Sequence, residues 1–234
     1  MRNVALLIVA GLSLCAHAAE IKTSPSFDNA EQVVNQFPVE TALLNIYTMG
    51  SSRTLSAIVY GHKESIEVKV TPKGAMVFEN KPVQGAEQSF TYRYDDEVIK
   101  ESVGINYFTP DPLTFYGLTN LSGDYSVATQ TTVIPKIASI GDSSKFITEH
   151  VYADSNKKTP VDLFSQFWSL SRASPNTAWL CIYTSKNLLL DVFDNDDSYS
   201  ECYQTNALGD ILQSKKSIQY LAENSVETIN YISE

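Results

Sequence analysis

Polar and apolar residues alternate along most of the chain after residue 54. Ile66, Val68 and Val70 fall on one side of their segment, whereas Glu67 and Lys69 fall on the other. A period of two is typical of a β-strand with one buried face. Further strands are predicted on the same grounds at residues 89–94, 98–108, 124–133, 145–152, 162–170, 177–183, 199–205 and 210–221.

One short helix is predicted in the segment that precedes these strands. Asp28 can cap a helix, with Glu31 three residues later as in a capping box, and apolar residues follow at helical spacing up to Phe37. Pro38 either ends this helix or opens a second short turn over residues 40–46. The segment 19–53 is therefore expected to be helical or irregular.

The predicted strands imply a mainly β protein. About ten strands, without a helical pattern between them, favour an antiparallel sheet that buries one face as a sandwich or a barrel. The β-rich domain is expected to span residues 54–234. Residues 107–123, rich in Pro and aromatic residues, divide its strands into two blocks. They form either a linker between two small β-subdomains or a long loop across a barrel mouth.

Residues 1–18 have the order of a secretory signal. A positive charge is followed by the apolar residues 4–14 and by small residues that predict cleavage after Ala18. An alternative is a lipid-modified N-terminus at Cys15, but the bulky Leu14 stands where a lipidation site needs a small residue. We therefore expect simple cleavage and a periplasmic or extracellular protein.

The charge of the chain limits the classes of partner that we expect it to bind. It has 17 Lys and Arg against 27 Asp and Glu, a net charge of −10, and it contains no basic run. Nucleic-acid binding and docking on anionic lipid are therefore not expected. An integral membrane protein is not expected either, because the signal is too short to span a bilayer and the strands lack a sustained lipid-facing alternation.

Two cysteines remain once the signal is removed, Cys181 and Cys202. An even pair in an oxidising compartment predicts a structural disulfide. Each lies in a predicted strand, and the short connection between the two strands requires them to be antiparallel. We expect a cross-strand bridge, with Trp179, Cys181 and Tyr183 on one face of their strand.

Several segments of the second half resemble those of Gram-negative bacterial secreted proteins and lipoproteins of unknown function. The upstream residues 40–48 and 104–112 are also similar, so the resemblance extends over most of the mature chain. It implies a β-rich cell-envelope protein and brings no activity or catalytic residues with it; a proper lipobox, common in that set, is absent here. The residues that carry it are Gly141-Asp142, Tyr152 with Asp154, Trp168, Trp179-Leu180-Cys181 and Cys202-Tyr203.

The most acidic stretch, residues 191–202, raises the question of a calcium site. An EF-hand loop that started at Asp194 would have Tyr199 in place of the required Gly and Thr205 in place of the terminal Glu. A weaker calcium candidate remains in the carboxylates of Asp194, Asp196 and Asp197. We favour a simpler interpretation, in which these acids form the water-exposed tip of a hairpin.

No catalytic or cofactor motif is present. The chain has no G-x-S-x-G, no phosphate-binding glycine loop and, after the signal, only His62 and His150 as histidines. No cofactor is expected, and an enzyme would need one of these histidines beside a carboxylate in a cleft. Paired carboxylates of the glycosidase kind can lie far apart in a sequence and leave no motif.

Four aromatic residues around two prolines offer a last candidate site: Tyr107, Phe108, Phe115 and Tyr116. They could form the rim of a ligand pocket, although we favour packing of the loop onto the sheet. The leading expectation is thus an exported envelope protein, a non-catalytic structural or binding module. The alternative is a carrier of a small apolar ligand with a lid at residues 107–116, and a hydrolase with an unidentified site is third.

Overall fold

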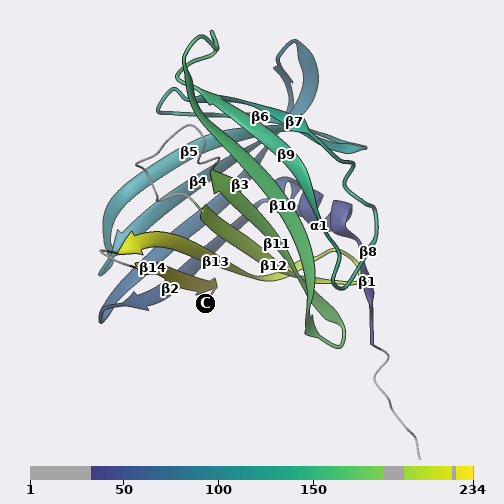
Figure 1. Ribbon diagram of the computed structural model, residues 1–234, viewed down its shortest axis with the longest axis vertical. Coiled ribbons are helices and arrows are strands. Elements are labelled where there is room, and N and C mark those ends of the chain that lie inside the picture. The colour runs from purple at the N-terminus through teal and green to yellow at the C-terminus, as the bar shows by residue number, and fades with distance from the viewer. Residues whose placement is uncertain (1–32, 187–197, 223–224, 234) are drawn as a thin grey trace, which may run out of the picture. The chain divides into compact units, whose positions relative to one another are not determined.

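The strands close into a barrel. The computed structural model describes residues 33–186, 198–222 and 225–233, which belong to one compact unit. Twelve antiparallel strands follow one another around the barrel, and the last returns to pair with the first (Figure 1). They are β2 (Ser51–Val59), β3 (His62–Phe78), β4 (Lys81–Tyr94), β5 (Glu97–Pro110), β6 (Leu113–Asn120), β7 (Tyr125–Gln130), β9 (Ser143–Tyr152), β10 (Pro160–Ser174), β11 (Thr177–Lys186), β12 (Ser198–Asn206), β13 (Ile211–Ala222) and β14 (Ser225–Ser233). The prediction of a mainly β protein is confirmed. Of the two architectures that the sequence left open, a sandwich and a barrel, the structure is a barrel.

Tight turns join the first strands of the barrel. The residue pairs Tyr60–Gly61, Glu79–Asn80 and Asp95–Asp96 all have positive φ at both positions. This is the geometry of a two-residue type I′ turn, whose twist matches that of the strands it connects.

The helix lies later in the sequence than its capping pattern predicted. α1 spans Val39–Thr48, directly after Pro38, while the residues from Val33 to Pro38 are not helical. Gln36–Phe37 forms the short strand β1, which pairs with β8 (Ala138–Ser139), and this pairing buries Phe37 completely. The pairing of β1 with β8 therefore determines the conformation of Gln36–Phe37, although apolar residues recur at helical spacing before Pro38. The predicted cap at Asp28 lies outside the described residues.

α1 closes one end of the barrel. Its apolar residues Ala42, Leu43 and Ile46 are buried in the largest core cluster, to which every strand from β3 to β7 and from β9 to β13 contributes. Two side-chain bonds fix the helix in place. The Glu40 carboxylate accepts a hydrogen bond from the Leu113 amide (3.0 Å), and the Asn45 amide donates to the Gly209 carbonyl (2.9 Å). α1 has ten residues, and no described helix is long and apolar enough to cross a membrane.

The segment from Tyr107 to Gly123 is part of the barrel wall. β5 and β6 meet in a tight hairpin at Asp111–Pro112, whose peptide bond is cis. The strands before and after this segment belong to the same barrel.

Candidate functional site

A cavity of about 310 Å³ lies inside the barrel next to α1. Strands β4 to β7 and β9 to β12 supply its walls, and the end of α1 contributes Ile46 and Tyr47. The lining is mixed, with several amides and acids beside the apolar groups. The remaining lining residues are Gln88, Phe90, Asn106, Leu118, Asn120, Asp124, Ser126, Glu149, Val151, Phe164, Gln166, Ile182, Thr184, Tyr199, Glu201 and Tyr203.

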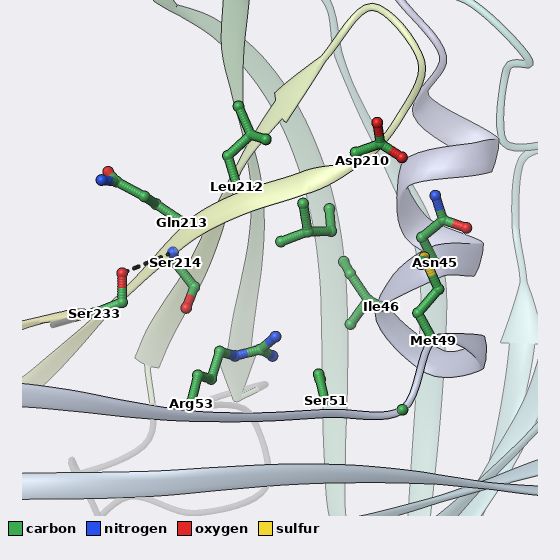
Figure 2. A pocket seen from close by; sticks show the side chains of 12 residues that line it. Asn45, Ile46, Met49, Ser51, Arg53, Asp210, Leu212, Gln213, Ser214 and Ser233 are labelled. Carbon is green, nitrogen blue, oxygen red and sulfur yellow. Dashed lines mark hydrogen bonds between the residues drawn. The ribbon is translucent and has the colours of Figure 1, made fainter.

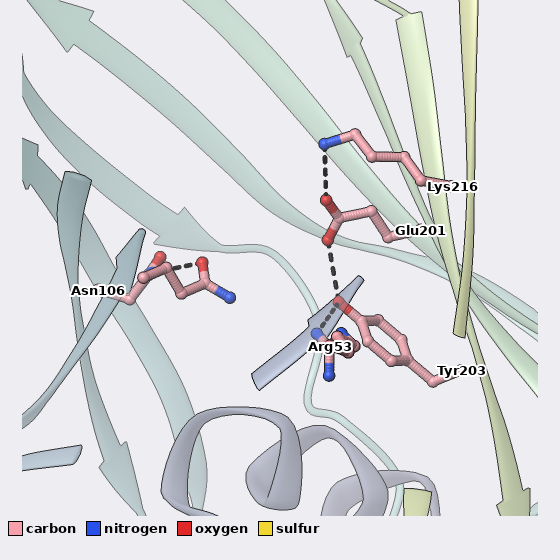
Figure 3. Close-up of polar contacts among 6 residues, drawn as sticks. Arg53, Asn106, Glu201, Tyr203 and Lys216 are labelled. Atoms are coloured by element: carbon pink, nitrogen blue, oxygen red, sulfur yellow. Dashed lines mark hydrogen bonds and ion pairs between the residues drawn. The ribbon is translucent and has the colours of Figure 1, made fainter. Parts of the chain in front are cut away.

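One wall of the barrel interior carries a connected charge network (Figure 3). The Lys216 ammonium lies 2.9 Å from Glu201 Oε1, and the Tyr203 hydroxyl donates to Glu201 Oε2 at 3.0 Å. Arg53 lies over the Tyr203 ring, with its guanidinium carbon 4.9 Å from the ring centroid. Burial alone would raise the pKa of Glu201, but the Lys216 ammonium outweighs it and holds that pKa below the usual range. Glu201 is therefore a paired carboxylate.

Lys216 is held by aromatic rings as well as by its acid. Its side chain is only 8% exposed, and its nitrogen lies 4.6 Å from the Tyr199 ring centroid and 5.1 Å from that of Phe90. Burial lowers the pKa of this lysine, yet the Glu201 carboxylate more than compensates and the pKa is raised. The barrel interior thus holds one ammonium between a carboxylate and two rings.

Glu149 is a second carboxyl group on the cavity wall, and its surroundings differ. Its partners are neutral: the Ser126 hydroxyl bonds to Oε1, and the Gln166 amide donates to Oε2 at 3.2 Å. No cation of the described chain lies within ion-pair distance of it. Burial raises the pKa of Glu149, and the bonds from Ser126 and Gln166 offset this only in part. Folding therefore favours its protonated form.

Tyr47 brings a hydroxyl from α1 to the same cavity. Its ring packs against Phe108 and Phe115, with centroid distances of 5.8 and 5.2 Å. Burial, followed by the nearby Glu201 carboxylate, raises the pKa of Tyr47, which therefore stays protonated. Among the described residues its hydroxyl has no hydrogen-bond partner. It is a polar group that a ligand could use.

A second opening of about 590 Å³ lies at the seam where the barrel closes. Within the described residues, β14 pairs with β2 at two positions only, Ile232 with Ser56 and Ser233 with Leu55. Beyond them, residues 211–213 of β13 face β2 without an intervening strand, while the Ser214 amide donates to the Ser233 hydroxyl at the end of β14 (3.3 Å). Figure 2 shows β13 and β2 on opposite sides of the opening, with Ile46 and Met49 at the end of α1 beside it.

The predicted disulfide is confirmed. Cys181 and Cys202 face each other in the register of β11 and β12, and their sulfurs are 2.09 Å apart. Their neighbours Ile182 and Glu201 line the cavity, so the bridge lies on the outer side of the barrel. A disulfide of this kind is compatible with an oxidising compartment.

The four aromatic residues of the predicted rim do not line the cavity. Phe108 and Phe115 are buried in the core around α1. Tyr107 stacks on Phe78, with 4.3 Å between ring centroids, in a separate cluster that Tyr116 also contacts. The residues 107–116 are a hairpin of the wall, whereas the alternative carrier function would have made them a lid. All four side chains pack against other residues of the protein, as the interpretation favoured from the sequence expected.

The two histidines lie away from the cavity. His62 contacts Asp95 (Nδ1 to Oδ2, 2.7 Å), but the side chains are about half exposed and occupy neighbouring hairpin ends. This hydrogen bond lowers the pKa of Asp95. His150 is exposed on β9. The calcium candidates Asp194, Asp196 and Asp197 lie outside the described residues, within which no group of three or more potential metal ligands is found.

Comparisons with family models, with curated proteins and with solved structures give no match to this chain.

Proposed function

We propose that the protein is a non-catalytic binding module whose barrel interior holds a small polar molecule. The observation that carries this proposal is the cavity of about 310 Å³, in which amides, acids and the Tyr47 hydroxyl converge. Ligand sites commonly combine an apolar wall with a few placed polar groups. The polar lining favours a polar ligand over the apolar one that the sequence suggested as an alternative.

We further propose that this binding takes place outside the cytoplasm. The signal-like residues 1–18 and the Cys181–Cys202 bridge support an exported protein. The resemblance to Gram-negative envelope proteins supports the same compartment, the periplasm or the cell exterior. An intact mass of the protein from its native envelope, compared with that of the chain cleaved after Ala18, tests export and lipidation at Cys15 together.

The binding proposal is tested by native mass spectrometry of protein purified from its own envelope without denaturation. We expect a retained small molecule in the wild type and its loss in Val151→Phe, because Val151 lines the cavity and a larger ring would occupy it. His150→Phe is the matched control, since this neighbour is exposed and points away from the interior. Equal ligand content in both variants would contradict the proposal.

A second candidate function, hydrolysis, is favoured by one observation. Glu149 and Glu201 line the same cavity, and their pKa values are displaced in opposite directions, upward for Glu149 and downward for Glu201. General acid and base pairs need this kind of difference. Turnover of p-nitrophenyl glycosides that is lost in both Glu149→Gln and Glu201→Gln would replace the binding proposal by this one.

A further inference from the structure

We propose that the cavity binds organic cations, with the Glu149 carboxylate as the counter-ion of a ligand ammonium group. This inference rests on the proposed binding function and names the class of its ligand. The charged residues among the described lining of the cavity are all acidic: Asp124, Glu149 and Glu201. Two cations lie on the same wall of the interior, but Lys216 is paired with Glu201 and Arg53 lies over the Tyr203 ring, so Asp124 and Glu149 remain to attract a ligand cation.

Glu149 is the acid best placed to receive the cation. Glu201 already has the Lys216 ammonium, and Asp124 accepts a hydrogen bond from the Asn120 amide at 2.8 Å near the turn between β6 and β7. Glu149 has only neutral donors, one on each oxygen. A carboxylate oxygen can accept more than one bond, so each oxygen has room for a ligand donor.

The energetics point in the same direction. A carboxylate in this half-buried position without a cation is costly, which is why the pKa of Glu149 is raised by burial. A ligand ammonium would remove this cost by pairing with the ionised form. Binding would then release a proton from the fraction of the protein in which Glu149 is protonated.

The barrel wall already places one ammonium group, that of its own Lys216, between a carboxylate and aromatic rings. Lys216 lies against Glu201 and over the rings of Tyr199 and Phe90. The cavity offers similar elements around Glu149, because Phe164 is the register partner of Glu149 and both line the cavity. Carboxylate and aromatic faces together are the usual recognition elements for amine ligands.

The size of the cavity limits the ligand. A volume of about 310 Å³ accommodates roughly ten non-hydrogen atoms, since a water molecule takes about 30 Å³ in the liquid. The Tyr47 hydroxyl, which lacks a partner among the described residues, can bond a second polar group of the ligand. We infer a compact amine with a short apolar body.

Three probes of similar size and different charge test the inference on the full chain: benzylamine, benzyl alcohol and benzoate. Amide chemical shifts in NMR titrations would locate and quantify binding. We expect benzylamine to shift residues that line the cavity, benzyl alcohol to bind at least tenfold more weakly, and benzoate not to bind. Glu149→Gln should weaken benzylamine at least tenfold. The control is Glu67→Gln, because Glu67 is paired with Arg93 (3.1 Å) and does not line the cavity.

The possible failures are distinguishable. Equal binding of benzyl alcohol and benzylamine, with no effect of Glu149→Gln, overturns the cation inference and leaves the binding function standing. An equal loss of benzylamine in Glu67→Gln and Glu149→Gln also overturns it, since net charge would then explain the effect. If no probe shifts the cavity residues and the native protein retains no molecule, both proposals fail.

Discussion

Glu149 and Glu201 show how two identical residues on one barrel wall acquire different properties. Lys216 pairs with Glu201, whereas Glu149 has only the neutral partners Ser126 and Gln166. The difference arises from single residues on neighbouring strands and not from the position of the acid in its own strand. It has consequences for stability that can be measured.

The first prediction concerns the pH dependence that Glu149 imposes. Its pKa is raised in the folded protein, so the folded chain holds this proton more tightly than the unfolded chain does. The free energy of unfolding therefore falls as pH rises from the usual Glu range through the raised value. Glu149→Gln removes this loss. We expect its Tm to equal that of the wild type near pH 4 and to exceed it by a few degrees at pH 7.5.

Thermal unfolding of the two proteins across this pH range checks the prediction. The difference between variant and wild type isolates Glu149 from the other titrating groups. A difference that is the same at both pH values would contradict the assignment of the raised pKa to this residue.

The second prediction concerns the Lys216–Glu201 pair. Lys216→Met leaves the half-buried Glu201 carboxylate without its cation, and we expect it to cost about 3 kcal/mol, the lower end of the range for buried pairs. The double variant Lys216→Met/Glu201→Gln removes both charges, so we expect it to regain most of that loss. Urea unfolding of the single and double variants measures the coupling. Simple additivity of the two changes would show that the pair does not act as a unit.

At the scale of the elements, the period of two predicted most strands because an inward and an outward face alternate along each of them. The strand expected at residues 145–152 lies within β9, and that expected at 177–183 lies within β11. Glycine is a strong turn signal, but Gly74 lies inside β3 at a register shift opposite β4. A bulge and a turn both use a glycine with positive φ, so the sequence alone does not separate them.

The cavity was harder to predict than the strands. Its acids and amides occupy inward-facing positions of their strands, as Glu149 does between Ile147 and Val151. A period of two predicts a buried face but does not separate a packed core from a cavity. A charged residue between apolar residues on the same face of a strand was the available signal. That distant strands such as β9 and β12 line one cavity was not visible in the sequence.

The third prediction concerns the β11–β12 hairpin. The Cys181–Cys202 bridge closes a loop with a sequence separation of 21, for which the chain-entropy model gives about 3 kcal/mol. The double variant Cys181→Ala/Cys202→Ala should lose roughly this amount in urea unfolding. The oxidised wild type and the wild type unfolded under reducing conditions provide the comparison. An unchanged stability would mean that the bridge does not restrict the unfolded chain.

At the scale of the whole barrel, the seam is the weakest junction. Among the described residues, neighbouring strands elsewhere in the barrel share longer registers than the two pairs between β14 and β2. The fourth prediction is that residues 211–213 exchange their amide hydrogens faster than residues 216–219, since the former lie beside β12 alone and the latter are paired with both β12 and β14. Hydrogen exchange with mass spectrometry measures this. Equal protection of both segments would show that the seam is closed in solution.

The order of the strands around the barrel also has a consequence for how the protein forms. Nearly every strand pairs with its neighbour in the chain, so hairpins can assemble in sequence order at a small loop-closure cost. The β14–β2 contact is different, because it joins the two extremes of the strand series. Assembly therefore remains an open sheet until β14 is present. For a chain that crosses a membrane before folding, this delay would keep the protein transport-competent until its last strand has crossed.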